Sequence, residues 1–221
     1  MKRILLLLTL VLLISVPALS QLNKYARPGD FQLGMRTTTS LFGHDNVTGL
    51  GYGGQFRVQI LKNLNTEWFS DWISMDLNGA GKRENAHIGW SLMFYPYTKG
   101  KLMPYIAAGH CFDYARVTPL STVFEDRNGD VVERWSSAVQ GGLGTHFFLS
   151  DRFNISVSAK YMLHLGKHLE YELTQTADGY YVDTHNHNDD TGRTLEGHLL
   201  LTASLNYRIF CLSKKNWRTN D

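Results

Sequence analysis

The sequence contains little cysteine and, beyond its first residues, no long hydrophobic run. Its 221 residues include only two cysteines, Cys111 and Cys211, so a disulfide-dense scaffold is excluded. After residue 20, no apolar run approaches the roughly 18 residues that a transmembrane helix requires. The formal net charge is only +2, which argues against a basic nucleic-acid-binding surface. The sequence also contains no complete catalytic motif, and we expect neither a cofactor nor a nucleic-acid partner.

The first 20 residues have the pattern of a secretory signal peptide. Lys2 and Arg3 form a basic start, residues 4–16 are mostly apolar, and the segment ending at Ser20 has a small-x-small cleavage pattern. We therefore predict cleavage after Ser20 and export of the chain. An oxidising compartment permits disulfides, but Cys111 and Cys211 are predicted to lie too far apart along the fold, and both are expected to be free.

From residue 31 onward, apolar and polar residues alternate with a period of two, which is typical of β-strands. In the clearest segment, one face carries Leu199, Leu201, Ala203, Leu205, Tyr207 and Ile209, and the other carries His198, Thr202, Ser204, Asn206 and Arg208. The same alternation predicts strands over residues 31–41, 52–61, 86–96, 136–149 and 153–164, and less regular strands over 67–77 and 103–117. We expect eight strands in all, counting the last segment.

One of the less regular strands carries a charge on its apolar face. Asp71 alternates in step with Phe69, Ile73 and Met75. A carboxylate on a membrane-facing surface is unfavourable, so a β-bulge near the membrane edge is expected here.

The spacers between the strands alternate in length. Those at residues 62–66, 98–102 and 150–152 are short, and most of the others are longer. Short periplasmic turns alternating with longer outer loops are typical of outer-membrane barrels. The sequence therefore predicts an all-β protein: an eight-stranded antiparallel up-and-down transmembrane β-barrel in a bacterial outer membrane. We expect a signal peptide at 1–20, a periplasmic lead at 21–30, the barrel at 31–210 and a periplasmic tail at 211–221.

Aromatic residues gather beside the predicted periplasmic turns, where they are expected to form an interfacial girdle. They are Trp68, Phe69, Phe94, Tyr95, Tyr97, Tyr105, Phe147, Phe148, Phe153, Tyr207 and Phe210. The alternative is a soluble eight-stranded barrel of the lipocalin type, with its apolar face inward. The polar face is rich in glycine and serine, which suits a narrow interior better than a solvated exterior.

The signal peptide, the eight alternating strands and the pattern of the last strand resemble small outer-membrane barrels of the OmpA/OmpX type. The segment Pro104-Tyr105-Ile106-Ala107-Ala108-Gly109 is similar to strands in the outer-membrane β-barrel domain family of Bacteroidota. The resemblance covers nearly the whole mature chain. It departs at the end, because residues 211–221 follow the last strand where such barrels often end on an aromatic residue.

The polar face collects charged residues that are expected to form an interior network. They are Arg36, Arg57, Lys160 and Arg208, with Asp76, Asp113 and Glu196 as candidate partners. An eight-stranded barrel is only just wide enough for its own side chains, and charges in a dry interior must pair. We expect a plugged interior; the alternative is an ion path through a narrow channel.

A weak candidate metal site lies in the last outer loop. His185, His187 and Asp189 would share one side of an extended backbone and could bind a divalent ion. Their spacing fits no standard zinc motif, so we expect no metal.

His110 is the residue that most suggests an enzyme. Outer-membrane lipid A deacylases resemble this chain in size and use a histidine, a serine and an acidic residue. Here Gly109-His110-Cys111-Phe112-Asp113 lacks the serine two positions after the histidine that such enzymes carry. The lipid A-modifying hydrolase therefore remains an alternative, and no catalytic residue is assigned.

Two outer loops carry hairpin signals. Asn128-Gly129 and Asp178-Gly179 lie between alternating residues, which predicts hairpins that protrude beyond the membrane. We expect a monomeric, non-enzymatic protein with a structural or surface-interaction role. Its expected partners are outer-membrane lipid, lipopolysaccharide and a possible extracellular ligand of the loops at 119–135 and 167–194.

Overall fold

The computed structural model describes residues 25–42, 47–120, 131–165, 172–177, 179–183 and 197–212. The strands are β1 (Asp30–Phe42), β2 (Thr48–Leu61), β3 (Leu64–Asp76), β4 (Gly81–Phe94), β5 (Leu102–Pro119), β6 (Val132–Phe148), β7 (Phe153–Leu165), β8 (Glu172–Thr176), β9 (Gly179–Asp183) and β10 (Gly197–Cys211). These ranges include no helix long and apolar enough to cross a membrane. The predicted signal peptide and nearly all of the predicted C-terminal tail lie outside them.

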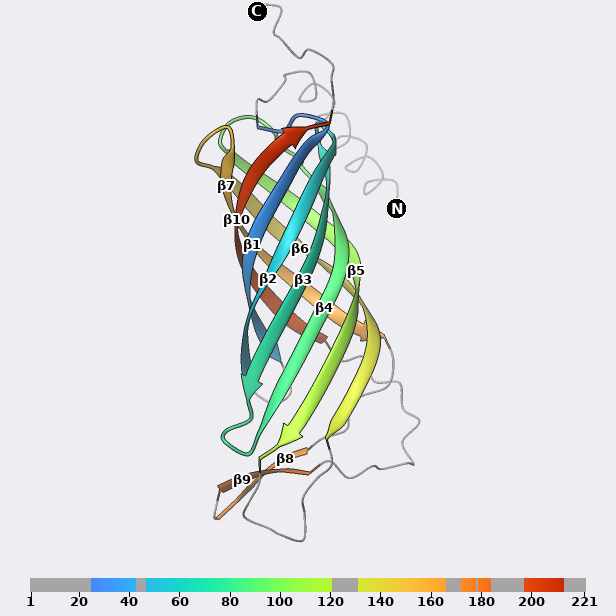
Figure 1. Ribbon diagram of the computed structural model, residues 1–221, viewed down its shortest axis with the longest axis vertical. Coiled ribbons are helices and arrows are strands. Elements are labelled where there is room, and N and C mark those ends of the chain that lie inside the picture. Colours follow the sequence, from blue (N-terminus) through green and yellow to red (C-terminus); the bar gives the residue numbers. More distant parts are fainter. Residues whose placement is uncertain are drawn as a thin grey trace, which may run out of the picture.

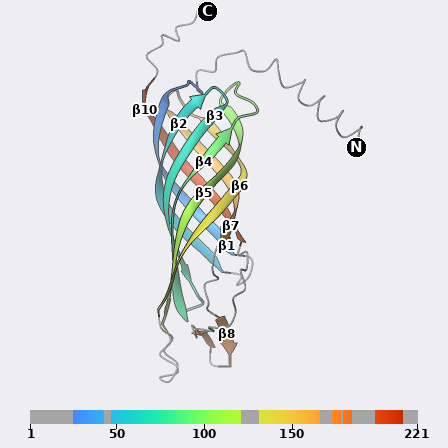
Figure 2. The ribbon, with the colours of Figure 1, turned by 90° about the vertical axis from the view of Figure 1, so that its right-hand side faces the viewer.

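Eight strands form one closed barrel in the order β1-β10-β7-β6-β5-β4-β3-β2. Every neighbouring pair is antiparallel, and the first strand closes on the last, with Asp30 opposite Cys211. Figures 1 and 2 show the strands tilted around a tall, narrow barrel. The predicted eight-stranded antiparallel barrel is therefore confirmed.

The two ends of the barrel differ in their connections. Residues 62–63, 95–101 and 149–152 join strands at one end, which we call the short-turn end and which lies at the top of Figure 1. The two longest connections, from β5 to β6 and from β7 to β10, lie at the opposite end, which we call the long-loop end; there β8 and β9 form a separate two-stranded sheet at the bottom of Figure 1. This alternation agrees with the short and long spacers of the sequence.

The outer surface is apolar and the interior is largely polar. On β10, Leu201 and Leu205 are exposed, whereas Thr202 and Ser204 are buried. The outward Met35 is 79% exposed, while its neighbour Arg36 on β1 is only 4% exposed. This arrangement is the reverse of a soluble barrel, in which the apolar face lines the interior, and it agrees with the alternation expected of a membrane barrel.

The prediction for β3 was wrong. Phe69, Asp71, Ile73 and Met75 all lie inside the barrel. The pairing of β3 with β4 runs without a shift from Leu64 to Asp76, so the strand contains no bulge on that side. Both faces of this strand are partly apolar, since Trp68 and Trp72 point outward, and an apolar residue is therefore no guide to the outward face here.

The predicted aromatic girdle is correct only in part. Phe69, Tyr95, Tyr105 and Phe148 are buried inside the barrel, each at most 4% exposed. The remaining girdle residues described, such as Trp68 and Phe94, lie outside. Because successive side chains of a strand point to opposite faces, an adjacent pair such as Trp68-Phe69 must be divided between the two surfaces.

Glycines on β2 make room for the long inward side chains of β3. A Cβ at Gly53 would overlap Oδ1 of Asp71, and one at Gly51 would lie 2.6 Å from the side chain of Ile73. Both separations are well below van der Waals contact. The glycines of β2 therefore let Asp71 and Ile73 lie flat against the barrel wall.

The hairpin predicted at Asp178-Gly179 is present as β8–β9, with Thr176 opposite Gly179. It is a separate sheet and does not continue the barrel strands. Val182 of β9 packs with Leu77, Ala80 and Val117 at the long-loop end of the interior. The hairpin thus covers apolar side chains at the barrel mouth. The other predicted tip, Asn128-Gly129, lies outside the described residues.

Candidate functional site

The interior of the barrel contains a charged centre around Glu67 of β3. Its carboxylate lies 2.7 Å from Nη2 of Arg57, 2.8 Å from Nζ of Lys160 and 3.4 Å from Nη1 of Arg36. All four side chains are at most 3% exposed. Ions in such a dry interior are tolerated only when they are paired and hydrogen-bonded, and Glu67 pairs with three cations at once.

Arg36 is also held by a second carboxylate. Its Nε lies 2.9 Å from Oδ1 of Asp71. The guanidinium carbon lies 4.5 Å from the centre of the Phe69 ring, and Nζ of Lys160 lies 5.3 Å from the same ring. Ring faces attract cations in this range. Arg36 and Lys160 are therefore fixed by two kinds of interaction.

Neutral polar side chains extend this centre toward the short-turn end. Arg57 donates to Ser156 Oγ at 2.9 Å, and Oγ of Ser156 lies 2.6 Å from Nδ1 of His146. Nε2 of His146 lies 3.0 Å from the hydroxyl of Tyr95. Gln55 donates to Asn206 Oδ1 at 2.5 Å. Because Arg36 also donates to Gln55 and Asn206 donates to Ser156, these groups form one connected hydrogen-bond network.

A second polar cluster, which we call the histidine cluster, lies nearer the long-loop end around Asp113. Its carboxylate lies 3.0 Å from Nε2 of His87, 3.1 Å from Nδ1 of His164 and 3.2 Å from Nη2 of Arg134. Nε2 of His164 lies 3.3 Å from Nδ1 of His198. Within the described ranges, no group of three or more His, Cys, Asp or Glu side chains has an arrangement that could hold a metal ion.

Apolar side chains lie between these two polar regions over part of the barrel, although Asp71 of β3 lies directly opposite His87 of β4. On β7, the successive inward residues are Lys160 of the charged centre, Met162 and His164 of the histidine cluster. Met162 belongs to a middle apolar layer made of Phe69, Ile73, Cys111, Ala138, Met162 and Leu200. Further apolar layers close the short-turn end, around Tyr95 and Tyr105, and the long-loop end, around Met75 and Val117. The interior therefore contains clusters of apolar side chains as well as polar ones.

The predicted interior residues fall into different places. Arg36, Arg57 and Lys160 meet at Glu67, whereas Asp113 belongs to the histidine cluster. Arg208 pairs with Asp30 at 2.9 Å near the short-turn end. Asp76 was expected inside but is exposed, and its Oδ1 accepts a hydrogen bond from Gly79 N in the turn between β3 and β4.

The remaining candidate residues either lie outside the described residues or lie outside the two polar clusters. Glu196 and the weak metal candidates His185, His187 and Asp189 lie outside the described residues. Cys111 is buried inside, where its Sγ lies 3.8 Å from Sδ of Met162, and Cys211, at the end of β10, has its Sγ 3.5 Å from the carbonyl oxygen of Pro28. These positions place the two cysteines far apart on the fold.

Sequence reasoning missed Glu67 and Asp71, the two acids of the charged centre. A strand that begins at Leu64 places Asn65, Glu67, Phe69 and Asp71 on one face by simple alternation. The inward cations need acidic partners, and the presence of two acids on this one face could have identified Glu67 and Asp71 as those partners. The signal was obscured because their face also carries Phe69 and Ile73.

His110 lies on the outer surface. Its ring meets that of Phe112 edge to face, with 5.2 Å between the centres. The described residues place no serine and acid with it in a catalytic arrangement, so this position offers no support for hydrolysis.

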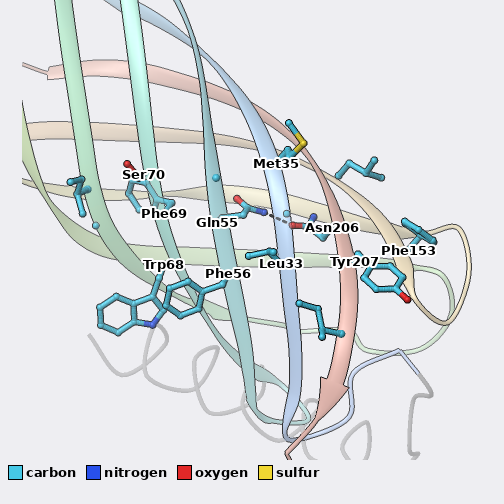
Figure 3. Close-up of a pocket in the computed structure, with 16 residues that line it drawn as sticks. Leu33, Met35, Gln55, Phe56, Trp68, Phe69, Ser70, Phe153, Asn206 and Tyr207 are labelled. Atoms are coloured by element: carbon cyan, nitrogen blue, oxygen red, sulfur yellow. Dashed lines mark hydrogen bonds between the residues drawn. The ribbon is translucent and has the colours of Figure 1, made fainter.

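The outer surface carries an apolar groove of about 770 Å³ over β1, β2, β3 and β10, with further lining residues from β4 and β7. Leu33, Phe56 and Leu205 line it, and the outward-facing Gly54 leaves part of its floor without a side chain. In Figure 3, Phe153 and Tyr207 lie together at one side of this groove and the overlapping rings of Phe56 and Trp68 lie at the other. The dashed line joins Gln55 and Asn206, behind the groove in the barrel interior.

No protein-family model matches the chain, and no curated protein matches it. Solved structures do match. The outer membrane protein OprG from Pseudomonas aeruginosa is 11% identical with a TM-score of 0.57, and the match covers 86% of this chain and 100% of that protein. Neisserial surface protein A is 12% identical with a TM-score of 0.54, and the match covers 81% of this chain and 96% of that protein. A major outer membrane protein from Thermus thermophilus is 8% identical with a TM-score of 0.54, and the match covers 81% of this chain and 99% of that protein. The chain therefore has the fold of small outer-membrane β-barrels.

Proposed function

We propose that the protein is a bacterial outer-membrane β-barrel that does not conduct ions and that has a structural or surface-interaction role. The observation that carries this proposal is the filled interior. Paired and hydrogen-bonded side chains around Glu67 and Asp113 occupy it, together with buried apolar side chains such as Met162 and Leu200. An ion crossing this interior would have to displace side chains that are already paired or packed together, and it would lose much of its water on the way.

The outward apolar surface supports the membrane location. Leu201, Leu205 and Met35 are exposed side chains that a bilayer would cover. In this location the short-turn end faces the periplasm and the long-loop end faces the exterior. We include in the proposal that the chain is a monomer whose lipid partners include lipopolysaccharide. The loops at 119–135 and 167–194 would contact an extracellular ligand.

Current measurements across a planar bilayer test the proposal. The mature protein, refolded and inserted, is expected to give no steady open-channel current. A reproducible conductance of porin size would overturn it and would favour the channel alternative.

A matched pair of variants sharpens this experiment. Leu200→Ser removes part of the middle apolar layer, and Leu201→Ser makes the same change on the outer surface one residue away. If the apolar layer blocks the interior, only Leu200→Ser raises the frequency of brief openings. Equal behaviour of the two variants would show that the layer is not the barrier.

We do not propose the lipid A hydrolase. His110 lies outside the barrel against Phe112, and no contact in the described chain prepares it for proton transfer.

A further inference from the structure

One side of the outer groove ends at a pair of interfacial side chains. The rings of Phe153 and Tyr207 are 4.8 Å apart between their centres, and both residues line the groove. The hydroxyl of Tyr207 accepts a hydrogen bond from Nη1 of Arg152 at 3.1 Å. An apolar surface therefore ends directly at a hydroxyl group and a guanidinium group.

A second hollow adjoins the groove at this point. It has a volume of about 500 Å³ and is lined by Lys101, Ser150, Asp151 and Arg152, among others. Phe153 lines both spaces. The hollow brings two cationic side chains together with a single carboxylate. Its charge favours an anion, and arginine is well suited to phosphate because its planar group offers several donors.

The backbone of the turn holds Arg152 in place. Oγ of Ser150 accepts hydrogen bonds from the backbone N of Arg152 at 3.2 Å and of Phe153 at 3.1 Å. The carbonyl oxygen of Arg152 accepts from the backbone N of Arg208 at 2.7 Å. The base of the arginine side chain is thus fixed before any ligand binds, which lowers the entropic cost of binding.

We infer that the groove and the hollow together bind an acidic phospholipid, with its phosphate at Arg152 and Lys101 and an acyl chain along the groove. The inference rests on the proposed outer-membrane location, in which the short-turn end faces the periplasm and the lipid belongs to the periplasmic leaflet. Aromatic residues at the membrane interface commonly lie at headgroup level, which agrees with the position of Tyr207 and Phe153 between the two spaces.

The groove offers a well-matched pair of blocking variants. Gly54 lies on the groove floor, and a Cβ there would meet only the carbonyl oxygen of Gly34, at 3.8 Å. Gly141 on β6 is also exposed and lies outside the groove, and a Cβ there would meet only the carbonyl oxygen of Ala107, at 3.8 Å. Gly54→Leu fills the groove, and Gly141→Leu adds the same side chain elsewhere.

Native mass spectrometry of the refolded full chain in detergent, titrated with phosphatidylglycerol or phosphatidylcholine, tests the inference. The wild type is expected to retain one phosphatidylglycerol about tenfold more tightly than phosphatidylcholine, because the anionic lipid gains a charge-assisted hydrogen bond. Arg152→Gln should remove this preference without weakening phosphatidylcholine. Gly54→Leu should weaken both lipids, while Gly141→Leu should weaken neither.

The outcomes separate this inference from the proposed function. Equal retention of the two lipids by the wild type, an unchanged preference in Arg152→Gln, or equal effects of the two leucine variants would overturn the lipid site. Tighter retention of lipopolysaccharide than of phosphatidylglycerol, sensitive to Gly54→Leu, would overturn the assigned leaflet and lipid. Gel mobility before and after heating reports folding of each variant. None of these readouts depends on conductance. A barrel that conducts ions would therefore contradict the proposed function without deciding whether the lipid site exists.

Discussion

At the scale of single residues, Glu67 holds the charged centre of the barrel interior together. It is the common partner of Arg36, Arg57 and Lys160. Removing one member of a buried ion network leaves the others without compensation, and the desolvated charges then destabilise the fold. Asp71 can satisfy only part of this loss, because of the three cations it is paired only with Arg36.

We therefore predict that Glu67→Gln lowers the free energy of unfolding by about 3 to 5 kcal/mol. Urea unfolding of the refolded barrel in lipid vesicles, followed by tryptophan fluorescence, measures the change. Glu133→Gln is the control, because Glu133 and Arg116 form an exposed pair and such pairs contribute roughly 0 to 1 kcal/mol. A Glu67→Gln barrel as stable as the control would show that the three cations do not depend on this carboxylate.

The sequence predicted the cations of this centre better than its acids. Arg36, Arg57 and Lys160 are predicted inward because each lies on the polar face of a clear alternation. Glu67 and Asp71 are not, because the apolar residues beside them are assigned to the membrane. The physical reason is that the interior of this barrel is not uniformly polar. Its apolar layers use the same residue types as the outer surface, and alternation alone cannot tell which face is which.

At the scale of the strand, β10 was predictable because its two faces differ clearly in polarity. Leu201 and Leu205 are exposed on the outer surface, and Thr202 and Ser204 are buried inside. The only apolar residue on its inner face, Leu200, belongs to the middle apolar layer. On β3, by contrast, both faces carry large apolar residues, and the assignment failed there for that reason.

Substitutions on β10 test the assignment of its faces. Arginine near the middle of the membrane costs roughly 2 to 4 kcal/mol in such barrels, so Leu201→Arg and Leu205→Arg should reduce the folded fraction. Thr202→Asn and Ser204→Asn place a polar group among polar neighbours and should be tolerated. Heat-modifiable gel mobility of membrane fractions reports the folded amount. Normal assembly of the arginine variants together with failure of the asparagine variants would mean that the apolar face is inward in solution.

At the scale of the whole molecule, the difference between the barrel ends predicts its orientation in the membrane. Glu133 lies at the long-loop end and Asp151 in a turn of the short-turn end. In a chain that carries Cys211→Ser, with Cys111 buried inside, a cysteine introduced at position 133 should react with an impermeant maleimide on intact cells. A cysteine introduced at position 151 should react only after the outer membrane is permeabilised. The opposite pattern would invert the proposed orientation.

The pairing of β1 with β10 also constrains how the molecule can assemble. The strand that begins at Asp30 hydrogen-bonds with the strand that ends at Cys211, and the other six barrel strands lie between them in the sequence. Until the last strand is in place, β1 and β7 each present a row of unpaired backbone N–H and C=O groups, which are costly to expose to lipid. Contacts between such distant parts of a chain form slowly. Closure of this seam must therefore come late, and an assembly factor that shields the two free edges would act on an intermediate that contains every strand but the last.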